Sequence, residues 1–128
     1  MLFFQRRKNK IFVIISDALR YEAAMELAEN ISKDSTDRVK VETEAIIGTI
    51  PSITKVGMAA LLPQNNLRFN QGDITINGIS VNGTNNRQKI LQEAVPEALA
   101  VSYKDIIGKN KDELMELIRG YYVVYIYH

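Results

Sequence analysis

The sequence has no cysteine and a single histidine, His128, among its 128 residues. Without cysteine there is no disulfide framework, no Cys-ligated zinc site and no thiol nucleophile. A multi-histidine metal centre or a Ser-His-Asp triad within these residues would have to use His128. The charges nearly cancel, with 16 basic and 15 acidic residues. Net charge therefore gives no reason to expect a nucleic acid or an anionic membrane as partner.

Long hydrophobic runs are also missing. No apolar stretch approaches the roughly 20 residues that a membrane-spanning helix needs. The apolar start at residues 1–4 is followed by basic residues, whereas a signal peptide carries its charges before the apolar stretch. We therefore expect a cytoplasmic protein without a membrane segment. The composition, with 46% hydrophobic and 24% charged residues, is that of a single globular domain.

The sequence of the first half of the chain predicts a strand, a helix and a second strand. Residues 10–16 are continuously apolar and β-branched, which is typical of a parallel strand buried on both faces. From about residue 18 to 33 the apolar positions recur at helical spacing. Residues 35–38 form a polar loop, and residues 39–47 alternate apolar and polar side chains, which predicts a half-exposed strand.

The second half continues this alternation. The predicted elements are a helix over 54–62, a hairpin over 73–83 turning at Asn77-Gly78, a helix over 84–94, a strand over 99–103, a helix over 112–119 and a strand over 121–127. Alternating strands and helices predict an α/β layer fold with a mainly parallel sheet and a small hairpin insertion. Because the last strand carries a strong signal and the chain stops one residue later, we expect the fold to be truncated. The four tyrosines of that strand are expected to pack on the sheet rather than stack on a ligand.

Asp17 is the first candidate site residue. It follows a strand directly, and ligand sites in parallel sheets lie beyond the carboxyl ends of the strands, where metals and phosphates are held. The alternative is that Asp17 only caps a helix beginning at Ala18. Arg20 would then lie in the first helical turn, where a cation is mildly unfavourable and an anion nearby would compensate.

The second candidate is the hydroxyl-rich loop over residues 48–54, directly before a predicted helix. Backbone N–H groups at a helix start can bind phosphate, and a nucleophilic alkoxide would be stabilised there. The alternative is that Ser52 or Thr54 is an N-cap. The sequence contains neither a G-x-G-x-x-G fingerprint nor a P-loop, which disfavours a nucleotide-binding domain.

Two motifs together resemble the PglZ domain family over essentially the whole chain. They are the Ser-Asp-Ala-Leu-Arg-Tyr-Glu run of residues 16–22 and the Pro-Ser-Ile-Thr-Lys-Val-Gly-Met-Ala-Ala-Leu-Leu-Pro run of residues 51–63. The closing Tyr-Ile-Tyr-His of residues 125–128 resembles the strand before that family's next acidic motif. The family belongs to the alkaline phosphatase superfamily and is known from BREX phage-defence systems. The resemblance implies a three-layer fold and hydrolysis of phosphate esters at two divalent metal ions, usually zinc.

The resemblance implies roles for two residues. Asp17 matches the metal-binding aspartate after the first strand, and Thr54 matches a metal-bound nucleophile at the start of a helix, with Thr49 as the alternative. The remaining ligands of the family would lie beyond residue 128, and His128 is not matched to one of them. Residues 1–128 are thus expected to be the amino-terminal part of one PglZ-like catalytic domain, inactive alone and able to self-associate. The expected partners are a phosphate-ester substrate and other phage-defence proteins. The alternative function is a non-catalytic scaffold or binding module of a defence complex.

Overall fold

A computed structural model describes residues 9–34 and 39–128. The apolar start at 1–4 and the predicted loop at 35–38 lie outside these residues. The chain divides into two compact units, one formed by residues 1–15 and 49–128 and the other by residues 16–48.

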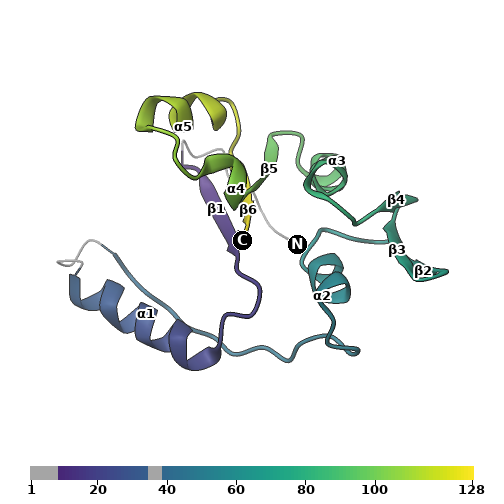
Figure 1. Ribbon diagram of the computed structural model, residues 1–128, viewed down its shortest axis with the longest axis horizontal. Coiled ribbons are helices and arrows are strands. Elements are labelled where there is room, and N and C mark those ends of the chain that lie inside the picture. Colours follow the sequence, from purple (N-terminus) through teal and green to yellow (C-terminus); the bar gives the residue numbers. More distant parts are fainter. Residues whose placement is uncertain (1–8, 35–38) are drawn as a thin grey trace. The chain divides into compact units, whose positions relative to one another are not determined.

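The first unit is built on a three-stranded parallel sheet. Its strands are β1 (Ile11–Ile15), β6 (Val123–Tyr127) and β5 (Ala98–Ser102), in the spatial order β1-β6-β5. Both pairings are parallel, so β6 lies at the centre although it comes last in the chain, as Figure 1 shows. The predicted α/β fold with a parallel sheet is confirmed.

Helices pack on both faces of this sheet. One face joins a cluster that also holds buried residues of α2 (Thr54–Ala60) and α3 (Thr84–Ala94). On the other face Leu99, Val101 and Val124 form a second cluster, against which partly buried residues at α4 (Tyr103–Ile106) and α5 (Lys111–Leu117) pack. This layering is the arrangement that α/β folds use to bury a parallel sheet.

The prediction that the first strand is buried on both faces is wrong for the described structure. Phe12 and Ile14 are 50% and 69% exposed, whereas Ile15 on the opposite face is buried. The prediction rested on the continuous apolar run, because strands of parallel sheets are usually apolar on both faces. Burial of the second side needs a covering layer, and the cluster beneath α5 draws its buried strand residues from β5 and β6 only.

A small antiparallel sheet accompanies the parallel one. It consists of β2 (Leu67–Asn70), β3 (Asp73–Ile76) and β4 (Ile79–Ser80). The predicted turn is present, because Asn77 and Gly78 both have positive φ between β3 and β4. Strand β2 was not predicted. Gln71 and Gly72, a second adjacent pair with positive φ, form the turn that joins β2 to β3.

The outer edge of β5 is paired with side chains of α3. The Ala100 amide donates a hydrogen bond to Gln88 Oε1 at 2.7 Å, and Gln92 Nε2 donates one to the Ala98 carbonyl at 3.1 Å. Unpaired strand edges invite the addition of a further strand. The two glutamines therefore close this side of the sheet.

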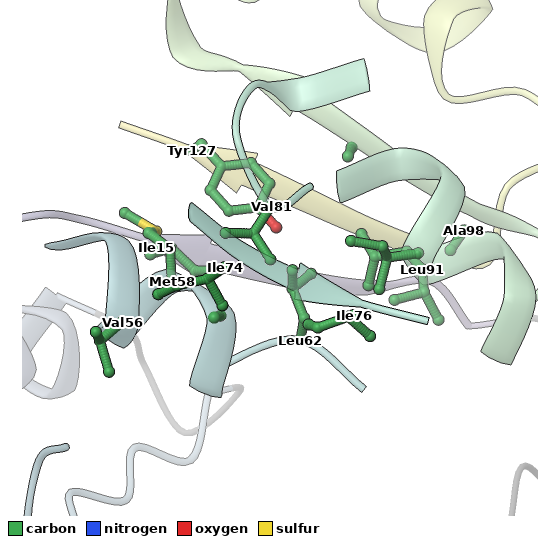
Figure 2. Packing of buried hydrophobic residues seen from close by; sticks show 14 residues of the cluster. Ile15, Val56, Met58, Leu62, Ile74, Ile76, Val81, Leu91, Ala98 and Tyr127 are labelled. Atoms are coloured by element: carbon green, nitrogen blue, oxygen red, sulfur yellow. The ribbon is translucent and has the colours of Figure 1, made fainter. Parts of the chain in front are cut away.

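Three of the four tyrosines pack on the sheet as predicted, whereas Tyr122 is 53% exposed, so the prediction is wrong for Tyr122. Tyr125 and Tyr127 join the cluster shared with α2 and α3, with their ring centroids 6.3 Å apart. Figure 2 shows Tyr127 in this cluster with Val81 and Ile15. The Arg87 guanidinium lies 4.6 Å from the Tyr127 ring centroid, a cation–π geometry. The Tyr127 hydroxyl is buried and has no hydrogen-bond partner among the described residues.

Burial raises the pKa of Tyr127 to about 12, with Arg87 opposing the shift. Since the unfolded phenol has a pKa of about 10, the unfolded chain loses this proton first as pH rises. Stability is therefore unaffected below about pH 10 and falls by roughly 2–3 kcal/mol between about pH 10 and 12. We expect Tyr127→Phe to remove this fall, as measured by urea unfolding of both proteins at a series of alkaline pH values.

At neutral pH the same substitution should raise the free energy of unfolding by about 1 kcal/mol, because it deletes a buried hydroxyl that makes no hydrogen bond. Tyr122→Phe is the matched control, since Tyr122 lies near the same strand but is 53% exposed. The expectation for Tyr127 fails if its phenylalanine variant is less stable than the parent or keeps the alkaline fall.

The second unit contains α1 (Tyr21–Asp34) followed by an extended segment. The helix begins three residues later than predicted. The strand predicted at 39–47 is wrong, because these residues have no regular secondary structure. Alternating apolar and polar side chains would give a strand one apolar face, but a strand also needs a neighbouring strand that pairs with its backbone groups. Among the described residues no helix is both long and apolar enough to cross a bilayer.

Candidate active site

The carboxyl ends of the parallel strands meet at one edge of the sheet. In the strand register, the last residues of β1 and β5, Ile15 and Ser102, both lie opposite Tyr127. Beyond this row, the His128 amide donates a hydrogen bond of 2.9 Å to the Ile15 carbonyl. Ligand sites of parallel α/β sheets form at such an edge. Residues that directly follow β5 and β6 are therefore candidates in the first unit, and Asp17 in the second unit and Thr54 in α2 are each taken separately.

His128 and Tyr103 lie together at this edge. Each directly follows a strand of the sheet, and their rings meet edge to face with centroids 4.9 Å apart. Ser102 accepts a hydrogen bond from the Lys104 amide and forms a capping box with Asp105. The short α4 helix thereby orients the backbone that carries Tyr103. The sequence analysis singled out His128 but not its aromatic neighbour.

Asp17 lies in the second unit, in the turn that follows β1. It is exposed, and its Oδ1 accepts a hydrogen bond of 3.0 Å from the Ala18 amide. Because α1 begins at Tyr21, Asp17 is not the N-cap of that helix, so the capping alternative is wrong. Arg20 likewise precedes the helix, and its carbonyl accepts the hydrogen bond of the Ala24 amide. The turn includes a non-glycine residue with positive φ, Ala18 at 58°.

Thr54 is the first residue of α2 and is exposed. The N-cap position belongs to Ile53, whose side chain makes no capping hydrogen bond. The alternative that Ser52 or Thr54 caps this helix is therefore wrong. Thr49 is half-buried and Ser52 is exposed, on the two sides of Pro51. Thr49 and Thr54 both belong to the first unit, whereas Asp17 belongs to the second.

Lys55, which the sequence analysis did not single out, ties α2 to the hairpin. Its Nζ donates a hydrogen bond of 3.1 Å to the Gly72 carbonyl and lies 3.4 Å from Asp73 Oδ1. Hydrogen bonds from the Ser80 hydroxyl and the Ile74 amide, with a smaller effect of Lys55, hold the pKa of Asp73 below its ordinary value. No sequence signal links Lys55 to Asp73, because they are 18 residues apart.

The described residues do not form a complete metal site. Across 9–34 and 39–128, no group of three or more His, Cys, Asp or Glu side chains is placed to hold a metal ion. A structural zinc site commonly has four protein ligands, and a catalytic one usually three. Asp17 and Thr54 offer a carboxylate and a hydroxyl, which are too few for the two zinc ions that the resemblance implies.

The chain was compared with known proteins. A family model described as the BREX system PglZ alkaline phosphatase-like domain matches residues 2–128. The alkaline phosphatase-like protein PglZ of Bacillus cereus is 38% identical over 129 residues, which covers 98% of this chain and 14% of that protein. The alkaline phosphatase-like protein BrxZ of Escherichia coli is 43% identical over 123 residues, covering 94% of this chain and 14% of that protein. The chain thus spans about one seventh of the length of these relatives. No solved structure matches it.

Proposed function

The chain belongs to the family of BREX PglZ alkaline phosphatase-like domains, and from this premise we propose that it forms part of a metal-dependent phosphatase or phosphodiesterase acting in phage defence in the cytoplasm. The observation that carries the proposal is the position of Thr54. Thr54 is an exposed residue at the start of α2, and the N-cap residue Ile53 makes no side-chain capping hydrogen bond. An exposed threonine at a helix start can approach a phosphate ester.

In the proposed reaction Thr54 Oγ1 attacks phosphorus in line with the leaving group. A bond forms between this oxygen and phosphorus, the bond to the ester oxygen breaks, and the hydroxyl proton leaves so that an alcohol is released. Water then hydrolyses the phosphothreonine, which restores the hydroxyl and yields phosphate, or a phosphate monoester if the substrate is a diester. When bound, divalent metal ions would lower hydroxyl pKa values and offset phosphate charge.

Asp17 is proposed as a ligand of one such ion, because a hard carboxylate oxygen beyond a parallel strand suits a divalent cation. The residues that the structure describes supply too few ligands for two ions, so the others are proposed to come from the rest of the full-length protein. Other proteins of the same defence system are the proposed partners. The second candidate function, a non-catalytic scaffold, is favoured by the incomplete ligand set among the described residues.

A direct assay separates the two functions. We expect the purified full-length protein to hydrolyse a generic aryl phosphate monoester or diester, to lose this activity in EDTA and to regain it when zinc is restored. Residues 1–128 alone should show no turnover above the buffer blank, because they lack most of the ligands. Absence of turnover by the zinc-loaded full-length protein on either ester class would favour the scaffold. Turnover by the isolated residues 1–128 would contradict the proposal that most of the metal ligands come from the rest of the full-length protein.

A further inference from the structure

The Asp73 carboxylate contacts donors from three segments of the first unit. Its Oδ1 accepts hydrogen bonds from the Ile74 amide at 2.9 Å and from Asn82 Nδ2 at 2.8 Å, and Lys55 Nζ lies 3.4 Å away. Ile74 belongs to β3, Asn82 precedes α3, and Lys55 belongs to α2. Each segment therefore contributes one donor to the same carboxylate oxygen.

The orientation of Asp73 does not depend on Lys55. The donors on Ile74 and Asn82 lie in the hairpin and the segment that follows it, so they hold the carboxylate in place before the lysine is considered. The lysine makes a second contact, to the Gly72 carbonyl, in the turn beside Asp73. Gly72 has a φ of 85°, which directs this turn through the left-handed region that glycine tolerates. The hairpin thus presents two preformed acceptors to one ammonium group.

The first turn of α2 needs an external support. The helix has only seven residues, and its N-cap residue provides no side-chain hydrogen bond. An isolated helix this short is unstable in water, so its stability must come from packing. Val56 and Met58 bury their side chains in the same cluster as Ile74, which fixes the apolar side of the helix against β3 (Figure 2). On its polar side, the contacts of Lys55 hold the first turn.

We propose that Asp73 and Lys55 are positioning residues for the Thr54 hydroxyl, and that the hairpin acts as a clamp on the first turn of α2. Thr54 and Lys55 are adjacent, so a rotation or fraying of this turn moves the hydroxyl. In-line attack tolerates little displacement, since a shift of about 1 Å can cost on the order of 100-fold in rate. The inference rests on the proposed function of Thr54. It explains what keeps the Thr54 hydroxyl aligned for attack.

The pair is not proposed as a main source of stability. The Lys55 and Asp73 side chains are 35% and 38% exposed, and ion pairs exposed to this degree contribute little to stability. Their expected effect is on geometry. It should appear in kcat, because alignment matters in the transition state, whereas KM should change little.

The test uses the full-length protein and the variants Asp73→Asn, Lys55→Ala and the double variant. Each single variant should lower kcat about tenfold with KM changed less than about twofold. The double variant should lose no more than Lys55→Ala, because removing the lysine already removes its contacts with both Asp73 and Gly72. Lys55→Arg should recover most of the activity. Glu116→Gln is the matched control, since it breaks the exposed pair between Glu116 in α5 and Arg119 just after this helix and should leave kcat unchanged.

Hydrogen–deuterium exchange gives a readout that does not require activity. Amides of residues 54–58 should exchange faster in Asp73→Asn and Lys55→Ala than in the parent, and at the parental rate in Glu116→Gln. Unchanged exchange overturns the clamp, as do multiplicative losses of kcat in the double variant. If Thr54→Ala keeps full turnover while exchange is altered, the proposed nucleophile fails and the clamp has another use. If Thr54→Ala is inactive while the pair variants turn over normally, only the positioning role fails.

Discussion

Replacing Thr54 with alanine in the full-length protein is expected to abolish hydrolysis of an aryl phosphate ester. The substitution removes the oxygen that is proposed to attack phosphorus, and no other residue in the first turn of α2 carries a hydroxyl. Loss of an enzyme's nucleophile lowers kcat by about 10³-fold or more. Thr54 is exposed and alanine is a good helix former, so the stability of the variant should stay close to that of the parent. Initial rates and thermal unfolding, measured on the same samples, check both statements.

Thr49 provides the matched comparison for this experiment. It lies in the same unit, five residues before Thr54, and is the alternative nucleophile of the sequence analysis. Thr49→Ala should retain most of the activity, and Thr54→Ser should retain a measurable part of it, because a hydroxyl remains. The assignment is wrong if Thr54→Ala turns over at the parental rate. If Thr49→Ala alone is inactive, the nucleophile is Thr49.

Asp17→Asn should reduce both bound metal and turnover in the full-length protein. The substitution removes a negative charge but keeps an oxygen that can accept the hydrogen bond from the Ala18 amide at 3.0 Å. The local turn should therefore persist while the attraction for a divalent cation falls. We expect turnover to fall about 100-fold or more, because even residues that only support metal ligands cost about 10–100-fold when they are mutated. Metal content per chain, measured by mass spectrometry after desalting, is the direct readout.

Glu22→Gln is the control for Asp17. Glu22 is another exposed acid of the second unit, five residues further along in α1, and it has no proposed role in metal binding. It should keep the parental metal content and rate. A parental metal content in Asp17→Asn would show that Asp17 is not a ligand. High zinc restoring the rate of Asp17→Asn would support weakened binding, whereas an unresponsive loss with full metal content would assign Asp17 another role.

Local patterns predicted the regular elements well where short-range chemistry defines them. The helix at Thr84–Ala94 has the predicted bounds, although its N-cap is Gly83 and not a hydroxyl residue. The turn at Asn77-Gly78 was predictable because both residues tolerate positive φ. In contrast, residues 39–47 alternate like a strand and are not one. Alternation describes a face, whereas a strand forms only where another strand pairs with it.

The residues of the candidate site show the same contrast between local signals and long-range contacts. Asp17 and Thr54 were identified because each stands beside a local signal, the end of a strand or the start of a helix. Lys55 and Asp73 were missed because their contact joins a helix to a hairpin 18 residues away. Contacts across such a distance depend on how α2 packs on β3, and no pattern within either segment contains that information.

The sequence by itself determined the class of fold, the family and the residues that could carry chemistry, because apolar periodicity, turn residues and short motifs are properties of neighbouring positions. The tertiary structure decided the strand order β1-β6-β5, the exposure of Phe12 and Ile14 and the convergence of three segments on Asp73. These features depend on backbone pairing and packing between segments far apart in the chain. That is why the lack of cysteine and the presence of only one histidine could limit the chemistry of these residues but could not reveal which residues are held together.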